Sequence, residues 1–196
     1  MEPAGTAEGM TLSMTTTFIA FDIEQPLQGA KVSLRVFQEN DITKAYIGWL
    51  NNPQVVRYSN QRFRQHTRES SLQYLATFDR CSNHFFAICD GATGAVVGTL
   101  TVYRNLHHRT ADIGIMVGDP ASWGRGIGLD AFRTMAQSLV RSGQMRKLTA
   151  GAVAENKAML RIMERAGFEL EAVRCGQELL DGRPVDLLYY ARFCHA

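Results

Sequence analysis

Hydrophobic residues follow two patterns along the chain, one that repeats every second residue and one that repeats every three or four. Ile113, Ile115 and Val117 alternate with glycine and methionine, which predicts a half-buried strand over 111–117 that ends before Asp119-Pro120. Similar segments predict further strands at 31–37, 84–89, 95–103, from Lys147 onward, 169–179 and 185–193.

The second pattern begins at Leu129, where apolar residues start to recur at three- and four-residue spacing. It predicts a helix from about Gly126 to Arg141 that is buried along one stripe. Capping residues and stop signals predict three other helices. They run from Asn40 or Asp41 to Leu50, from Thr67 through Phe78, and from Asn156 to Gly167. The order of elements predicts a mixed sheet with helices on both faces.

Length and composition predict one domain. A chain of 196 residues, 45% of them hydrophobic, can bury one sizeable core, and nothing in the composition demands a second. Residues 1–17 carry no core pattern, so we expect a mobile N-terminal leader there and a single domain over 18–196.

Charge and cysteine content indicate which kinds of ligand and partner the protein binds. A formal net charge of +2 leaves no large basic surplus, so binding to nucleic acid is not indicated. The four cysteines show no C-x-x-C spacing and no zinc-binding set, so we expect no metal and reduced thiols. No apolar run is long enough to span a membrane, and the first basic residue is Lys31. These features predict a cytoplasmic protein that binds neither nucleic acid nor membrane.

Three glycines carry the strongest indication of function. Gly124, Gly126 and Gly128 follow the predicted strand 111–117 and lie in the loop and first turn of the next helix. Unpaired backbone N–H groups and the positive end of the helix dipole favour a phosphate at such a position. Glycines also gather at tight turns and at helix–sheet contacts that bind no ligand, so the spacing alone leaves both interpretations open. Leu129 excludes the dinucleotide-binding fingerprint, and the Walker A lysine is missing.

A second strand-to-helix segment, from Lys147 to Phe168, has Asn156 at its junction. With both segments the chain resembles the GNAT superfamily of acyl-CoA-dependent N-acetyltransferases, whose signature is Gln/Arg-x-x-Gly-x-Gly/Ala after the fourth strand. Trp123-Gly-Arg-Gly-Ile-Gly128 matches it, with tryptophan in the Gln/Arg position as in the branch that includes ribosomal-protein-alanine and amino-sugar acetyltransferases. The more distal family pattern is matched by Asn156, Gly167 and Phe168.

The resemblance covers roughly residues 31 to 193, and it implies an α/β (α+β) fold with a mixed, mostly antiparallel central sheet of about seven strands. It also implies acetyl-CoA as co-substrate. The backbone of Met116, Val117 and Gly118 would bind the pantetheine arm and polarise the thioester carbonyl, which makes Met116 a catalytic candidate. Arg125 could pair with a phosphate oxygen or could simply be solvated. The residues implied for acetyl-CoA binding are Met116, Val117, Gly118, Trp123, Gly124, Arg125, Gly126, Ile127, Gly128, Leu129 and Asn156.

Asp112 is the candidate general base, since it stands fourteen residues before Gly126, where some family members place a glutamate. Its side chain is one methylene shorter, so a water relay would be needed; the alternative is a charge on an edge strand. The tyrosine that the family often uses as general acid is replaced by Met163. A thiol with a pKa of about 8.5 is already a good leaving group near neutral pH. Tyr103, Tyr189 and Tyr190 are substitutes for the acid or simply packing residues.

Acceptor choice is expected to depend on the last hairpin and on residues 53–68, which interleave arginines with aromatic residues. Such a segment suits an anionic, ring-bearing acceptor, and the alternative is a solvated loop whose arginines pair with nearby acids. A histidine in the loop before residue 111 could border the acceptor pocket or lie on the surface. The candidate acceptor-binding residues are Arg57, Tyr58, Arg62, Phe63 and His107.

The resemblance therefore implies an N-acetyltransferase that transfers an acetyl group from acetyl-CoA directly to a primary amine. The expected acceptor is a small amine, such as a nucleotide-linked amino sugar. One alternative is a protein N-terminal acetyltransferase of the ribosomal-protein type, which would act on a peptide amine. Alternatives from other classes are a non-catalytic acyl-CoA-binding regulator, which the missing tyrosine allows, and a nucleotide-binding module. Either a single chain or a homodimer is compatible with the sequence.

Overall fold

The computed structural model describes residues 25–194, so the expected leader at 1–17 lies outside the described residues. Its helices are α1 (Lys44–Leu50), α2 (Arg68–Leu75), α3 (Ile127–Arg141) and α4 (Lys157–Arg165). Its strands are β1 (Leu27–Gln28), β2 (Val32–Val36), β3 (Asn83–Asp90), β4 (Val96–Asn105), β5 (Thr110–Val117), β6 (Lys147–Val153), β7 (Glu169–Leu180) and β8 (Arg183–Phe193).

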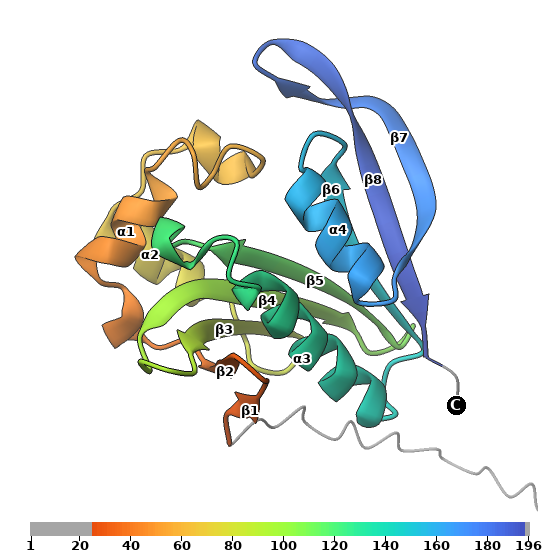
Figure 1. Ribbon diagram of the computed structural model, residues 1–196, viewed down its shortest axis with the longest axis horizontal. Coiled ribbons are helices and arrows are strands. Elements are labelled where there is room, and N and C mark those ends of the chain that lie inside the picture. The colour runs from red at the N-terminus through yellow and green to blue at the C-terminus, as the bar shows by residue number, and fades with distance from the viewer. Residues whose placement is uncertain (1–24, 195–196) are drawn as a thin grey trace, which may run out of the picture.

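All eight strands form one sheet, in the order β1-β2-β3-β4-β5-β6-β8-β7 (Figure 1). Neighbouring strands are antiparallel except for β5 and β6, which run parallel, so the prediction of a mixed, mostly antiparallel sheet is confirmed. The sheet has one strand more than expected because β1, at two residues, is too short to produce an alternating pattern. Figure 1 shows the β7–β8 hairpin extending beyond the rest of the sheet.

Two predicted helices are shorter than expected. The first begins at Lys44 because Glu39–Asp41 forms a separate 3-10 turn and the Thr43 side chain caps α1 by accepting from the Tyr46 N–H at 3.2 Å. The second ends at Leu75 instead of Phe78. Both differences arise at helix ends, where capping contacts decide the boundary more than hydrophobic spacing does.

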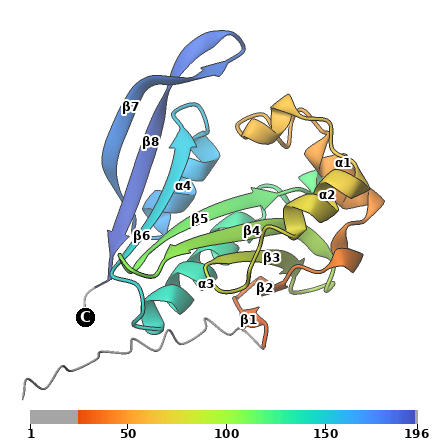
Figure 2. The ribbon, with the colours of Figure 1, turned by 180° about the vertical axis from the view of Figure 1, so that it is seen from behind.

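Helices cover both faces of the sheet, as the sequence predicted (Figures 1 and 2). On one face, α3 and α4 pack into the main core, where Phe132 and Met163 are fully buried. On the other face, α1 and α2 pack with Tyr46 and Phe85 in a second cluster. Side chains of β5 alternate between the two, since Ile113 belongs to the first cluster and Met116 packs against the second. The two faces of β5 therefore meet different parts of the molecule.

Trp49 of α1 packs on the end of β5 at Gly118. A methyl group added at Gly118 would lie 2.3 Å from the indole ring, which is far inside contact distance. We therefore expect Gly118→Ala to lower the free energy of unfolding by about 1–3 kcal/mol through overpacking. Gly48→Ala is the matched control in α1, where an added methyl meets nothing within 4 Å, and it should stabilise by roughly 0.5–1 kcal/mol. Urea unfolding of both variants tests the pair, and equal stabilities would contradict this packing.

Strands β5 and β6 separate after a short paired region. They pair only at Thr110 with Lys147, Ala111 with Leu148 and Asp112 with Thr149. β5 continues alongside β4 as far as Val117. From 113 to 117, the edge of β5 that faces away from β4 therefore carries peptide groups with no strand partner among the described residues. This open edge brings unpaired backbone donors and acceptors into the middle of the sheet.

Candidate functional site

The open edge of β5 leads directly into the amino terminus of α3. Gly126 is the N-cap residue, with φ at 83°, and it offers no side chain to bind the first-turn amides. The first α-helical hydrogen bond runs from the Asp130 N–H to the Gly126 carbonyl at 3.0 Å. The N–H groups of residues 127–129 therefore have no acceptor within the helix, and they combine with the helix dipole to favour an anion.

The three glycines of the loop have different physical roles. Gly124 and Gly126 both have positive φ, at 73° and 83°, a conformation that side-chain-bearing residues rarely adopt. Gly128 is buried within α3, and a methyl group there would lie 3.1 Å from Ile162 Cδ1 and 3.3 Å from Val117 Cγ2. All three glycines are candidates for acetyl-CoA binding, and Gly128 also has a packing role, between α3, α4 and β5.

Several of the predicted donor-binding groups already have partners within the chain. The Gly118 N–H donates to the Val97 carbonyl at 2.9 Å, and Trp123 Nε1 donates to the Val117 carbonyl at 2.8 Å. The Asn156 side chain caps α4 by accepting from the Met159 N–H at 3.1 Å. The Gly118 N–H and the Val117 carbonyl are therefore already hydrogen-bonded within the chain, and the side chain of Asn156 is occupied in starting its helix.

Arg125 projects from the loop toward the β3–β4 turn. Its Nη2 lies 3.0 Å from Asp90 Oδ2, and that aspartate side chain is only 4% exposed. The pKa of Asp90 is lowered below its ordinary value, first by the Ala92 N–H that donates to it and also by Arg125. The charge of Arg125 is thus balanced by a carboxylate of the same chain.

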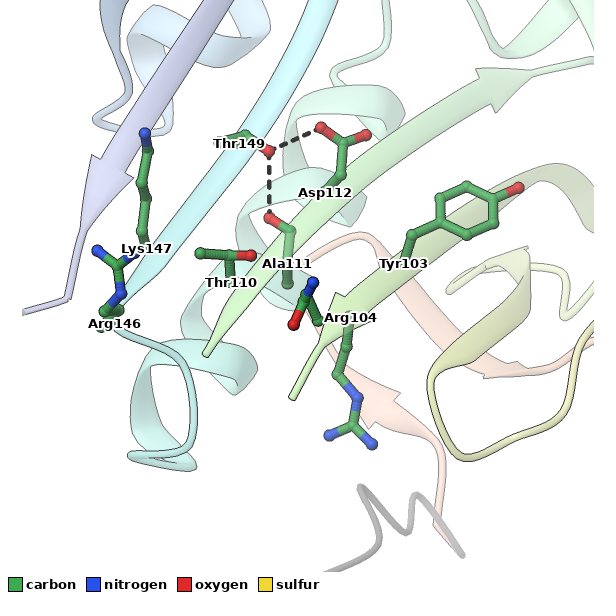
Figure 3. Close-up of a pocket in the computed structure, with 9 residues that line it drawn as sticks. Tyr103, Arg104, Thr110, Ala111, Asp112, Arg146, Lys147 and Thr149 are labelled. Carbon is green, nitrogen blue, oxygen red and sulfur yellow. Dashed lines mark hydrogen bonds between the residues drawn. The ribbon is translucent and has the colours of Figure 1, made fainter. Parts of the chain in front are cut away.

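Asp112 lies on the opposite face of the sheet from α3, at the point where β5 and β6 separate (Figure 3). It is partly buried and accepts a hydrogen bond from Thr149 Oγ1 at 2.7 Å. Burial raises the pKa of the Asp112 carboxyl, and the Thr149 bond offsets part of that rise. β5 runs between β4 and β6, so the alternative that Asp112 is an edge-strand charge is wrong.

A cavity of about 380 Å³ opens beside Asp112. Tyr103 faces Asp112 across the β4–β5 pair, and its hydroxyl lies 3.1 Å from the hydroxyl of Tyr74 on α2. The cavity therefore opens on the same face of the sheet as α2. Its lining residues are Tyr103, Arg104, Asn105, Thr110, Ala111, Asp112, Arg146, Lys147 and Thr149.

The contacts of the three tyrosines considered as general acids distinguish them from one another. Tyr190 donates to Glu164 Oε1 at 3.1 Å, and the Tyr189 ring stacks under the Arg174 guanidinium at 4.9 Å. Tyr103 is the only one of the three that lines the cavity with Asp112. Met163 is fully buried in the core, where it fills space and faces no solvent.

The predicted acceptor segment contacts the tip of the β7–β8 hairpin. Arg62 donates to the Leu179 carbonyl at 3.0 Å and to the Ser59 carbonyl at 2.8 Å, and Arg57 lies 3.4 Å from Asp181. These contacts agree with the alternative interpretation, in which the arginines pair with groups of the same chain.

The aromatic residues of the segment, and His107, are placed differently. Tyr58 packs with Val153, Leu180 and Val185, whereas Phe63 is 68% exposed. Trp49 touches the end of β5 and Tyr58 the end of β6, so the chain between them joins the ends of the two separating strands. His107 is exposed in the β4–β5 turn and does not line the cavity.

Three residues near these sites had not been identified from sequence. Thr149 contacts Asp112 from β6, and Asp90 holds Arg125 from the end of β3. Lys31 donates to the carbonyl of Arg125 from 94 residues earlier in the chain. Each of these contacts joins segments that are distant in the sequence, so no local sequence pattern predicts it. Over residues 25–194, no cluster of three or more His, Cys, Asp or Glu side chains could hold a metal, and no helix is long and apolar enough to cross a membrane.

The sequence has relatives among known acetyltransferases. The family model for the acetyltransferase (GNAT) domain matches residues 31–169, which is more than half of the chain. YjcK of Bacillus subtilis, a probable N-acetyltransferase, is 24% identical over 108 residues, which make up 54% of this chain and 59% of that protein. The matched region thus spans less than two thirds of this curated relative.

Solved structures share the fold. The spermidine N-acetyltransferase from Vibrio cholerae, in complex with CoA and spermine, has a TM-score of 0.74 at 18% identity over 84% of this chain and 96% of that one. An acetyl transferase from Salmonella typhimurium that modifies the N-terminal serine of a ribosomal protein has a TM-score of 0.73 at 18% identity over 87% and 100%. These likenesses establish the fold, and the family model establishes the relationship. The chain belongs to the GNAT family of N-acetyltransferases.

Proposed function

We propose that the protein transfers the acetyl group of acetyl-CoA directly to the amine of a small molecule, in the cleft where β5 and β6 separate. The observation that carries this proposal is the end of β5–β6 pairing at Asp112 and Thr149, from which the open edge of β5 runs to Val117, next to the uncapped amino terminus of α3. The open edge and the helix terminus supply backbone donors to one elongated ligand. A carboxyl group with a raised pKa stands at the same separation point.

The donor would approach from the face covered by α3. The N–H groups of residues 127–129 would bind its diphosphate, and Gly124 and Gly126 would allow the loop to approach the phosphates closely. The pantetheine arm would lie along the open edge of β5 from 113 to 117 and use its unpaired peptide groups. A backbone N–H of this edge would polarise the thioester carbonyl and stabilise the negative charge that develops on its oxygen.

The amine would enter from the opposite face, through the cavity beside Asp112. An ammonium ion must lose a proton before its nitrogen can attack, and Asp112 would accept that proton directly or through one water molecule. The neutral amine nitrogen then forms a bond to the carbonyl carbon while the carbon–sulfur bond breaks, and the second proton that the nitrogen must lose passes to water or, by way of Tyr103, to the departing sulfur. The sulfur leaves as a thiolate, whose pKa of about 8.5 makes a dedicated acid unnecessary. Tyr103, which lines the same cavity, is the nearest candidate to protonate it.

The contacts of the acceptor segment favour a small amine over an anionic sugar nucleotide. Arg57 and Arg62 bind the hairpin tip, so their guanidinium groups are not pre-organised to bind a phosphate. Trp49 lies at the end of β5 and Tyr58 packs against the cluster that contains Val153 of β6, so the segment between them would narrow the approach for a folded protein. Related structures include enzymes named for spermidine and for a ribosomal protein. A peptide N-terminus therefore remains the second candidate acceptor.

Arg62 is expected to shape the acceptor side of the cleft through its hold on the hairpin. Its side chain is 15% exposed, and it donates to two backbone carbonyls. Arg62→Ala should raise KM for the amine by roughly fivefold, equivalent to about 1 kcal/mol, and should leave the Kd of CoA unchanged. Arg57→Ala is the matched control, because the Arg57 side chain is 56% exposed and its ion pair with Asp181 contributes little. Equal effects of the two variants would contradict this role.

A free-thiol assay with acetyl-CoA and a panel of amines tests the proposal. The panel contains polyamines, amino sugars and peptides with free N-termini, and mass spectrometry identifies the N-acetyl product. We expect saturable thiol release with at least one small amine and little with peptides. Turnover with peptides alone would establish the second candidate, and binding of CoA without turnover on any amine would indicate a non-catalytic regulator.

A further inference from the structure

A lysine from a distant part of the chain lies against the glycine loop. Lys31 immediately precedes β2, and its Nζ donates to the carbonyl oxygen of Arg125 at 2.7 Å. The same Nζ is 3.3 Å from the point that a Cβ on Gly126 would occupy. The ammonium group therefore stands beside Gly126, the N-cap residue of α3.

The position of Lys31 is fixed by its backbone. Its N–H donates to Asp130 Oδ2 at 2.7 Å, and the Val32 N–H donates to the same oxygen at 3.1 Å. Its carbonyl accepts from the Gly91 N–H at 2.7 Å. Asp130 lies in the first turn of α3, so its carboxylate ties the start of β2 to the start of that helix. These three bonds hold the base of the lysine while its ammonium reaches the loop.

Charge distinguishes Lys31 from Arg125. The Arg125 guanidinium is 3.0 Å from Asp90 Oδ2, whereas no carboxylate of the described residues lies within 4.0 Å of Lys31 Nζ. An ammonium group has three donors, and the Arg125 carbonyl takes one of them. Two donors of the ammonium group are thus left, next to the N-cap residue of a helix whose first-turn amides favour an anion. Charge-assisted hydrogen bonds of this kind are about twice as strong as neutral ones.

We propose that Lys31 contacts the diphosphate of the acyl carrier, and that it, in place of Arg125, supplies the positively charged side chain of that site. This proposal rests on the proposed function, since it takes acetyl-CoA as the donor bound at α3. The lysine adds a charge to the backbone amides of residues 127–129, and it does so from β2. Arg125 acts differently, by holding the loop to the β3–β4 turn through Asp90.

Calorimetry with three ligands tests the role of Lys31. The ligands are CoA, dephospho-CoA, which lacks the 3′-phosphate, and pantetheine, which lacks all phosphates. Lys31→Met removes the charge and keeps the length of the side chain, and Lys31→Arg keeps the charge. We expect Lys31→Met to weaken CoA and dephospho-CoA by the same factor, roughly tenfold or more, and to leave pantetheine unchanged. Lys31→Arg should retain most of the affinity, and Lys44→Met, on the opposite face of the sheet, should match the wild type.

The other outcomes overturn the proposal in distinguishable ways. Unchanged affinity for CoA in Lys31→Met would show that the lysine is not a ligand of the phosphates. A loss confined to CoA would assign it to the 3′-phosphate, and an equal loss for pantetheine would assign it a purely structural role. Failure of the wild-type protein to bind CoA would overturn the proposed function as well.

Discussion

Asp112→Asn is expected to lower kcat/KM for the amine by about 100-fold or more, the usual contribution of a general base. In the wild type, kcat/KM should rise with pH as Asp112 loses its proton. Burial raises the pKa of this carboxyl, so the rise should occur at a higher pH than an ordinary aspartate would give. The variant has no carboxyl to ionise, and its profile should lose this limb. Steady-state rates measured across the pH range test both expectations.

Stability provides the control for Asp112→Asn. The raised pKa means that ionisation of Asp112 disfavours the folded state. The stability contributed by the protonated carboxyl is fully present below the pKa that Asp112 has in the unfolded chain, and it is lost as pH rises through its pKa in the folded protein. At neutral pH the amide should therefore be at least as stable as the carboxylate, since Thr149 Oγ1 can still donate to it. A variant that loses activity together with stability, or that keeps an unchanged pH profile, would contradict the role of base.

Gly126→Val is expected to abolish measurable binding of CoA. Gly126 has φ at 83°, and a β-branched residue rarely adopts this conformation. The side chain would also point toward Lys31, whose Nζ lies 3.3 Å from the added Cβ. The loop would have to change its conformation, and the amides of residues 127–129 would no longer point together at one anion. Titration calorimetry with CoA measures the loss directly.

Gly143→Val is the matched control at the other end of α3. Gly143 has φ at 66°, and an added Cβ meets nothing within 4 Å, so the backbone strain is similar while the loop is untouched. We expect both variants to lose about 1–2 kcal/mol of stability and only Gly126→Val to lose CoA. If Gly143→Val loses CoA to the same extent, the effect is one of general stability. If Gly126→Val binds CoA normally, the glycine loop does not form the diphosphate site.

The sequence predicted the parts of this molecule that depend on local periodicity. The alternation at 111–117 and the change of spacing at Leu129 are local properties, and the structure has β5 and α3 at these positions. The glycines between them carry a backbone conformation that only their own residue type allows easily. The strand, the loop and the helix start could therefore be identified before any tertiary contact was known.

The parts that depend on tertiary contacts could not be predicted. Gly128 is explained by its contacts with Ile162 and Val117, which the sequence does not bring together. Arg62 had been expected to face a ligand, but Leu179, 117 residues away, supplies its acceptor. The partner of Asp112 is Thr149, which reaches it through the parallel pairing of β5 with β6. Such contacts follow from the order of strands in the sheet, and hydrophobic spacing does not specify that order.

A crystal structure of the protein with acetyl-CoA bound would show where the donor lies relative to β5 and α3. We expect the diphosphate to accept hydrogen bonds from the N–H groups of residues 127–129 and the pantetheine arm to run along β5 from 113 to 117. The thioester should lie at the separation of β5 from β6, with Asp112 on the opposite face of the sheet. A carrier bound at another surface, or an arm that makes no backbone hydrogen bonds to β5, would contradict the account.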